Sequence, residues 1–254
     1  MTRRLWSSAN LVLALLIAVP IACLAQAPMA VTASGPVQEL EANGINIFRG
    51  IPFAAPPVGA LRWRTPQTAE KWTAVRPATT AGPACRQTRG MFLENGGDPG
   101  RLDENCLYLN VFSPRVERTA RLPVMVWIHG GALIFGSGAL PIYDGSALAR
   151  RDVVVVTINY RLGAFGFFAH KGLDQETPGG PVNIGLLDQI ATLRWVQSNI
   201  DAFGGDPARV TIAGQSAGAQ SVLALMASPL AAGLFSGAFA QSPYGIPSHS
   251  RAKA

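Results

Sequence analysis

The sequence predicts an α/β protein with a largely parallel sheet, and three observations lead to this prediction. Two apolar runs, at 124–128 and 153–158, are nearly continuous hydrophobes, as expected of central strands covered on both faces. An apolar stripe at helical spacing follows them over 186–200. A third strand-like run, Val210–Gly214, then leads into Gly-Gln-Ser-Ala-Gly. Strands that alternate with helices in this way pair mostly in parallel.

The Gly-Gln-Ser-Ala-Gly stretch predicts a sharp corner between a strand and a helix. Gly214 and Gly218 leave room where the strand and the helix pass close together. Ser216 would then stand clear at the helix N-terminus, with the amide of Ala217 directed toward a developing oxyanion. A chance Gly-x-Ser-x-Gly match is the alternative, but the flanking strand and helix favour a nucleophile.

Length and composition are those of one sizeable α/β core. The chain has 254 residues, of which 48% are hydrophobic and 14% charged, and this balance excludes a disordered protein. The formal net charge of +6 comes partly from basic residues at the two ends of the chain. Because no dense run of Lys and Arg lies elsewhere, we expect no nucleic-acid partner.

The first residues have the three parts of a secretory signal. Arg3 and Arg4 precede an apolar run over 11–24, and small residues follow that run. A membrane anchor is the alternative, but the uncharged stretch is short for a span and Pro20 interrupts it. We therefore expect a secreted or periplasmic protein without a stable membrane anchor.

Two cysteines remain once Cys23 has been removed with the signal, namely Cys85 and Cys106. An even pair in an exported chain favours a disulfide, which would stabilise the fold by a few kcal/mol at this loop length. Two unpaired buried thiols are the alternative.

The N-terminal part of the mature chain predicts a hairpin and then irregular structure. Short alternating segments, 37–40 and 45–48, flank Asn43-Gly44, which is a hairpin signal. Prolines make the stretch 50–59 an extended surface segment, because they remove hydrogen-bond donors and fix φ. Residues 76–105 form a long loop, which is usually functional or tied down. Further strands are predicted over 107–112 and 237–242.

A second glycine-rich stretch, His129-Gly130-Gly131-Ala132, directly follows a predicted central strand. Small residues there let the backbone turn and present N–H groups outward. Such a loop can supply further oxyanion donors beside the amide of Ala217. By itself the stretch would be an ordinary strand-to-loop turn, and only the serine corner favours the oxyanion role.

Five motifs, in order along the chain, make the sequence resemble the type-B carboxylesterases, the cholinesterase-like branch of the α/β-hydrolases. They are Phe48-Arg49-Gly50-Ile51-Pro52-Phe53-Ala54, Glu104-Asn105-Cys106-Leu107-Tyr108-Leu109-Asn110, Asn159-Tyr160-Arg161-Leu162-Gly163, Phe203-Gly204-Gly205-Asp206-Pro207 and Gly214-Gln215-Ser216-Ala217-Gly218. The resemblance covers about Val37 to Ser242. It implies an α/β-hydrolase fold with a mostly parallel central sheet and helices on both faces.

The resemblance also implies roles for particular residues. Ser216 would be the nucleophile of a carboxylic ester hydrolase that acts through an acyl-enzyme, on a small-molecule ester and without a metal or organic cofactor. The implied partners are the oxyanion amides of Gly131, Ala132 and Ala217, a Cys85–Cys106 disulfide, and the structural ion pairs Arg62–Glu104 and Arg161–Asp188.

The sequence departs from the family in three respects. Gln215 stands where the family usually has Glu, and Asn105 where it usually has Asp. In the family, the acid and the histidine of the triad follow the serine far downstream, in a chain roughly twice this long. None of His129, His170 and His249 matches the position of that base.

We therefore expect a chain truncated after the serine corner and the strand that follows it, and inactive by itself. Residues 1–27 would be the signal peptide and 28–254 the N-terminal part of the esterase domain. The alternatives are a non-catalytic binding or adhesion protein on the same fold, which would not need Ser216 and its oxyanion loop, and a degraded gene product without a function.

Signal removal gives the first testable expectation. The mature protein should begin between residues 25 and 30, because the small residues after the apolar run form the cleavage site. N-terminal sequencing of exported protein checks this, and exported material that still begins at Met1 would contradict it.

Overall fold

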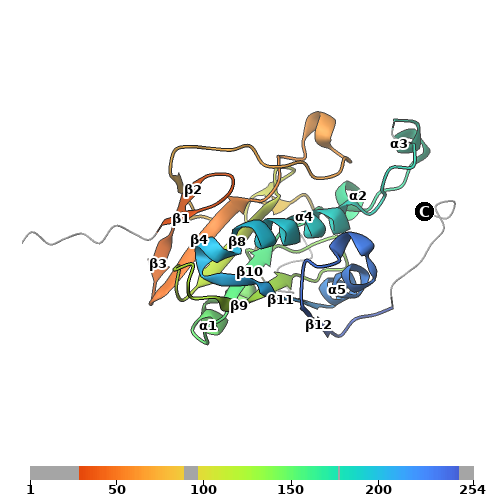
Figure 1. Cartoon of the computed structure of the whole chain (residues 1–254). Coiled ribbons are helices and arrows are strands. Elements are labelled where there is room, and N and C mark those ends of the chain that lie inside the picture. The colour runs from red at the N-terminus through yellow and green to blue at the C-terminus, as the bar shows by residue number, and fades with distance from the viewer. Residues whose placement is uncertain (1–28, 89–96, 177, 246–254) are drawn as a thin grey trace, which may run out of the picture.

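A seven-stranded sheet forms the centre of the molecule (Figure 1). The computed structural model describes residues 29–88, 97–176 and 178–245, so the expected signal peptide lies outside the described residues. The strand order is β12-β11-β9-β10-β8-β4-β3. The bounds are β3 (Leu40–Ala42), β4 (Ile45–Pro52), β8 (Tyr108–Ser113), β9 (Leu122–Ile128), β10 (Val154–Ile158), β11 (Gly205–Gln215) and β12 (Gly237–Gln241).

The sheet is mixed, which corrects the expectation of a mostly parallel sheet. Strands β12, β11, β9 and β10 are parallel to one another. The β10–β8, β8–β4 and β4–β3 pairs are antiparallel. The apolar runs could not predict strand direction, since a strand buried between two layers is continuously apolar whether its neighbour is parallel or antiparallel. The parallel half is the one that carries Ser216.

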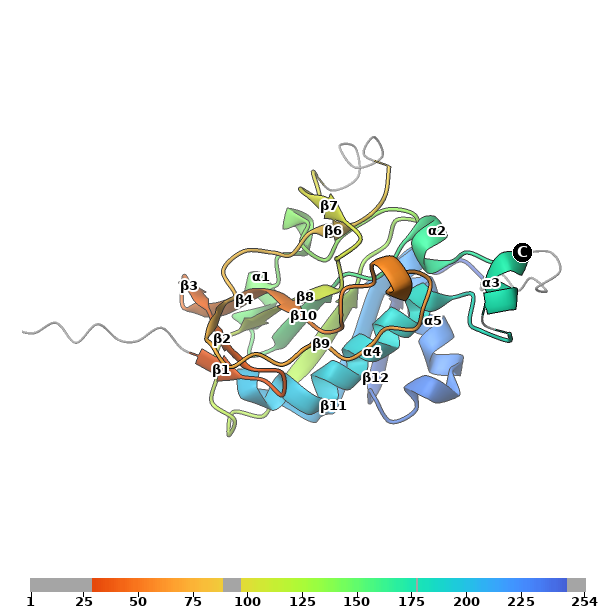
Figure 2. The same ribbon diagram turned by 90° about the horizontal axis from the view of Figure 1, so that it is seen from above.

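Helices cover both faces of the sheet, as predicted (Figures 1 and 2). Helices α4 (Ile184–Asn199) and α5 (Ala217–Ala227) pack on the face that carries Val154, Val156 and Ile158 of β10. The short helix α1 (Ser146–Ala149) packs on the other face, where Ala149 meets Val155. Alternate residues of β10 thus point into two separate apolar layers, as the two-residue period of a strand requires.

The N-terminal region differs from its prediction in two details. The hairpin at Asn43-Gly44 joins β3 and β4, but residues 36–38 belong to another sheet. That sheet consists of β1 (Met29–Val31), β2 (Pro36–Gln38) and β5 (Arg76–Pro77). Residues 50–52, expected to be irregular, end β4, because a bulge after Phe48 lets the strand resume beside β8.

The long loop before the central strands is tied down by short pairings. Strands β6 (Ala84–Cys85) and β7 (Leu102–Asp103) pair with each other, and Cys85 is bonded to Cys106.

Two short helices that the sequence did not signal, α2 (Gly163–Gly166) and α3 (Lys171–Glu176), follow β10. Within the described ranges, no helix is long and apolar enough to cross a membrane.

Both ion pairs expected from the sequence are present. The Arg62 guanidinium donates to both carboxylate oxygens of Glu104, at 2.6 and 2.8 Å, on a partly exposed surface. The Arg161 guanidinium donates to both oxygens of Asp188, at 2.8 and 2.7 Å, and its backbone N–H donates to Asp188 at 3.0 Å. The second pair is buried and fastens the start of α4 to the segment after β10.

Breaking the buried pair should destabilise the fold far more than breaking the exposed one. An Arg161→Met substitution leaves the Asp188 carboxylate buried without a cation, which costs about 3–5 kcal/mol of unfolding free energy. Removing both charges in Arg161→Met/Asp188→Leu should cost less than the single change. Urea titrations test this, with Arg62→Met as the matched exposed control. Equal losses in the Arg161 and Arg62 variants would contradict it.

Candidate active site

Ser216 occupies a strained corner between β11 and α5. Its φ of 56° and ψ of −122° lie outside the regions that residues with a side chain usually adopt. Close packing of the backbone enforces the corner. A Cβ added at Gly218 would lie 2.1 Å from the Ile128 carbonyl oxygen, and one added at Gly214 would lie 2.5 Å from the Gly218 carbonyl carbon. The glycines are therefore required, as the sequence predicted.

Two backbone hydrogen bonds hold the corner in place. The Ser216 N–H donates to the Gln241 carbonyl of β12 at 3.0 Å, and the Ser216 carbonyl accepts from the Gln220 N–H at 2.9 Å. Ala217 is the first residue of α5, so its N–H has no partner within the helix. The half-buried serine side chain thus lies at the positive end of an 11-residue helix.

The loop after β9 has the conformation that its glycines allow. Gly131 has a φ of 106°, and Ala132 and Leu133 also have positive φ values, of 53° and 63°. The Gly131 carbonyl accepts from the N–H groups of Ile134 and Phe135, which closes the loop into a turn. Among the hydrogen bonds of the described residues, the N–H groups of Gly131, Ala132 and Ala217 have no acceptor. These are the amides predicted for the oxyanion hole.

The serine and this loop share one hollow, here called the serine pocket, with a volume of about 320 Å³. Gly130 lies against the corner, since a Cβ built there would be 3.4 Å from the Ser216 Cβ and 3.1 Å from the Gln215 side-chain oxygen. The lining residues are Gly130, Gly131, Ala132, Phe135, Gly136, Leu140, Tyr143, Gln215 and Ser216. The pocket therefore brings together the predicted nucleophile and two of the three predicted oxyanion residues.

The His129 side chain packs against the loop after β9, and its burial keeps the ring neutral. Its ring is fully buried, stacks on Tyr160 at 4.4 Å between ring centroids, and has Nδ1 2.8 Å from the Gly130 carbonyl oxygen. The Tyr160 hydroxyl donates to the His129 carbonyl at 2.8 Å. Burial lowers the pKa of His129 to about 4. Because the Gly130 carbonyl can only accept, Nδ1 carries the proton.

Sequence reasoning missed Gln87, which connects the disulfide loop to the loop after β9. Its side-chain amide donates to the carbonyls of Cys85 and Gly136, at 2.8 and 3.0 Å. Its side-chain oxygen accepts from the Gly136 N–H at 2.8 Å. Gly136 lines the serine pocket, so this pairing fixes one side of the pocket. The one available signal was the position of Gln87 two residues after a cysteine.

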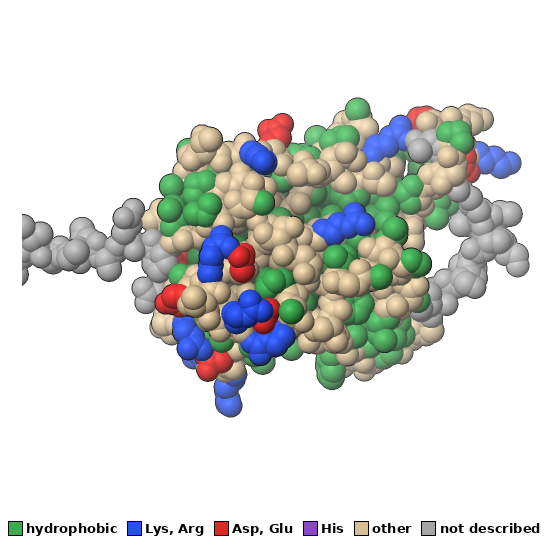
Figure 3. Space-filling view, in the orientation of Figure 1, with side chains coloured by type: hydrophobic (Ala, Val, Ile, Leu, Met, Phe, Trp, Pro, Cys, Tyr) green, Lys and Arg blue, Asp and Glu red, His purple; other side chains and the backbone are tan. Residues whose placement is uncertain are grey.

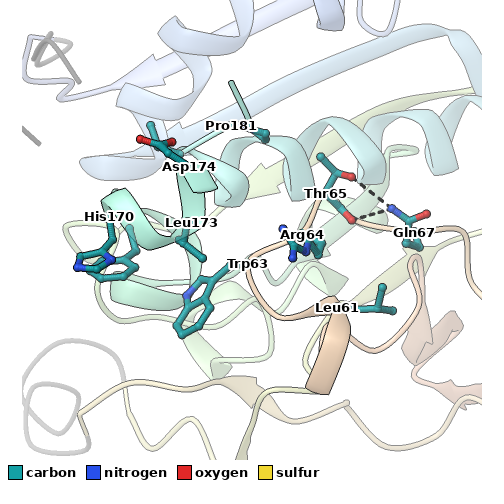
Figure 4. A pocket seen from close by; sticks show the side chains of 12 residues that line it. Leu61, Trp63, Arg64, Thr65, Gln67, His170, Leu173, Asp174 and Pro181 are labelled. Atoms are coloured by element: carbon teal, nitrogen blue, oxygen red, sulfur yellow. Dashed lines mark hydrogen bonds between the residues drawn. The ribbon is translucent and has the colours of Figure 1, made fainter. Parts of the chain in front are cut away.

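The other histidines do not reach the serine in the part of the chain that the structure describes. His170 lies on the surface, with its ring 5.7 Å from that of Phe168, and lines a different hollow between residues 61–67 and α3 (Figure 4). That hollow contains none of the predicted site residues. His249 lies outside the described residues. Across the described ranges, no group of three His, Cys, Asp or Glu side chains is placed to hold a metal ion.

Comparison with known proteins decides the family. The model of the carboxylesterase family matches residues 27–251, which is most of the chain. The chain belongs to the carboxylesterase family. This member is 48% identical to the fumonisin B1 esterase of Sphingopyxis macrogoltabida over 229 residues, covering 89% of this chain and 42% of that protein. It is 47% identical to the para-nitrobenzyl esterase of Bacillus subtilis (strain 168) over 212 residues, covering 83% and 42%.

Solved carboxylesterases share the fold of this family member. A thermophilic para-nitrobenzyl esterase superposes with a TM-score of 0.79 at 46% identity, covering 85% of this chain and 44% of that chain. A carboxylesterase of Geobacillus stearothermophilus superposes with a TM-score of 0.75 at 43% identity, covering 83% and 42%. The α/β-hydrolase prediction is thereby confirmed. The chain spans less than half the length of these relatives.

The buried neutral state of His129 should make this carboxylesterase-family chain sensitive to acid. The unfolded histidine has a pKa near 6.5, whereas the folded one has a pKa of about 4. Between these values the unfolded state binds more protons, so stability falls as the pH falls. The loss from pH 7 to pH 5 should be roughly 2 kcal/mol.

Urea titrations at the two pH values test this expectation. A His129→Asn variant should lose that part of the pH dependence, and a His170→Ala variant should keep it, because His170 is exposed. The same pH dependence in all three proteins would contradict the assignment.

Proposed function

We propose that this chain carries the nucleophile and the oxyanion hole of a carboxylic ester hydrolase. One observation carries the proposal: Ser216 stands at a strained helix N-terminus, packed against a loop in which the N–H groups of Gly131 and Ala132 have no acceptor among the described residues. Gly131 is half-buried and Ala132 is exposed, and both line the serine pocket, so a bound substrate can reach their N–H groups. An oxyanion that forms beside Ser216 would satisfy them.

In this proposal the reaction passes through two acyl-transfer steps. The Ser216 Oγ attacks the ester carbonyl carbon, and its proton passes to a base. The carbonyl oxygen becomes an anion that accepts from the amides of Gly131, Ala132 and Ala217. The protonated base returns the proton to the departing alcohol oxygen, which leaves an acyl-serine. Water then gives a proton to the base as it attacks the acyl carbon, and the base returns this proton to Ser216 as the carboxylic acid leaves. The neutral Gln215 places no charge next to the developing anion.

We propose that the base and its orienting acid lie in sequence beyond these 254 residues. In support, the serine pocket has no histidine among its described lining residues, and the relatives are about twice as long. We propose a small-molecule carboxylic ester as the substrate. The family supports this, and so does the small volume of the serine pocket, which backbone amides line. We also propose export through residues 1–27, with which a disulfide in the domain is compatible.

The proposal predicts that activity needs both Ser216 and a C-terminal partner. The chain alone should hydrolyse p-nitrophenyl butyrate no faster than its Ser216→Ala variant. Residues 28–242, fused to the C-terminal part of the B. subtilis para-nitrobenzyl esterase, should turn over the ester. Replacing Ser216 by Ala in this fusion should lower kcat by at least about 10³-fold.

Ser198→Ala is the matched control, because this serine lies exposed on α4 and should leave turnover unchanged. Turnover by the 254-residue chain that is lost in Ser216→Ala would place the base within the chain, and His249 would be replaced first. A fusion that keeps its kcat after Ser216→Ala would contradict the proposal that Ser216 is the nucleophile.

A further inference from the structure

A third hollow lies between α4 and residues 65–69, away from the serine pocket. This α4 groove has a volume of about 540 Å³. Its lining residues are Ala33, Ser34, Phe53, Thr65, Pro66, Gln67, Thr68, Ala69, Leu187, Ile190, Ala191, Arg194, Trp195, Ser198, Asn199 and Leu230. None of them lines the serine pocket, so a ligand here would not touch Ser216.

The interior of the groove is apolar. Phe53 and Ile190 form a buried base, and Leu187 and Ala191 add half-buried side chains one helical turn apart. Leu230 stands at the margin with 56% of its surface exposed. In Figure 3, hydrophobic and uncharged side chains cover most of the surface over α4 and α5. A strip of this kind accepts an alkyl chain, because burying both apolar surfaces releases water.

One positive charge stands over this apolar strip. Arg194 is the sole ionisable residue in the lining, and its side chain is exposed. In the described part of the chain it has no ion pair and no hydrogen-bond partner. The arginines at the far end of the sheet differ, since Arg115 and Arg118 each pair with an aspartate. The charge of the groove is thus uncompensated and positive.

Neutral hydrogen-bonding groups surround the arginine. Ser198 follows it by one helical turn, and Gln67 and Thr68 also line the groove. No acidic residue lines the groove, so nothing there would repel an anion. An anionic group that can accept two parallel hydrogen bonds matches the planar guanidinium best.

We propose that the α4 groove binds an amphipathic carboxylate, such as the anion of a medium-chain fatty acid. The carboxylate pairs with the Arg194 guanidinium, and the alkyl chain lies along Leu187, Ile190 and Ala191. Inorganic anions lack the apolar part, and alcohols lack the charge, so neither satisfies both features. The ligand belongs to the same chemical class as the acid that ester hydrolysis releases, but the binding requires neither Ser216 nor turnover.

Binding of decanoate to the 254-residue chain tests the proposal. Isothermal titration at concentrations where decanoate is monomeric should show one site, whereas decanol and acetate should bind at least about tenfold more weakly. Arg194→Ala should weaken decanoate binding by about 10- to 100-fold, the range expected for a hydrogen-bonded ion pair. Arg194→Lys should retain part of the affinity, because it keeps the charge and loses the planar fork.

Two further variants locate the site. Ala191→Trp fills the groove and should abolish decanoate binding, while Arg150→Ala removes an exposed arginine outside the groove and should change nothing. Ser216→Ala should bind decanoate as the wild type does. Affinity that survives both Arg194→Ala and Ala191→Trp would overturn the proposal. Binding lost in Ser216→Ala alone would also overturn it, because the ligand would then occupy the serine pocket.

Discussion

Close approach of three backbones governs the structure. The end of β9, the end of β11 and the first turn of α5 meet where only glycine fits, at Gly214 and Gly218. Any side chain there would separate the helix from the sheet. The packing of the apolar core on both sides keeps these segments together, and Ser216 absorbs the resulting strain in its own φ and ψ angles. The reactive position is therefore a product of the core.

The same constraint extends outward through polar side chains that bind backbone. Asn159, at the end of β10, accepts from the Gly138 N–H and donates to the carbonyls of Pro83 and Cys106. Gln87 makes a comparable connection to Gly136. These two side chains join the disulfide loop and the loop after β9 into one body. The disulfide does not line the serine pocket, but Gln87 connects Cys85 to Gly136, which does.

Much of this arrangement could be read from local sequence signals. The Gly-x-Ser-x-Gly corner, the helix α4 and the central strands are each determined by residues that are close in sequence, and the structure contains all three. Strand direction could not be read, because β8 and β10 are equally apolar in an antiparallel pair and in a parallel one. Gln87 could not be found either, since its partner Gly136 is 49 residues away and no periodicity connects them.

The hydrogen bond from the Ser216 N–H to the Gln241 carbonyl has a consequence for biosynthesis. A growing chain emerges from the ribosome N-terminus first, so β8, β9, β10 and β11 are available before β12. The serine corner therefore gains its last backbone partner only after residue 241 has left the exit tunnel. Until then the corner has only one of its two backbone hydrogen bonds, the one from Gln220 to the Ser216 carbonyl. The last hydrogen bond of the reactive serine thus forms only when the sheet beside it has been extended.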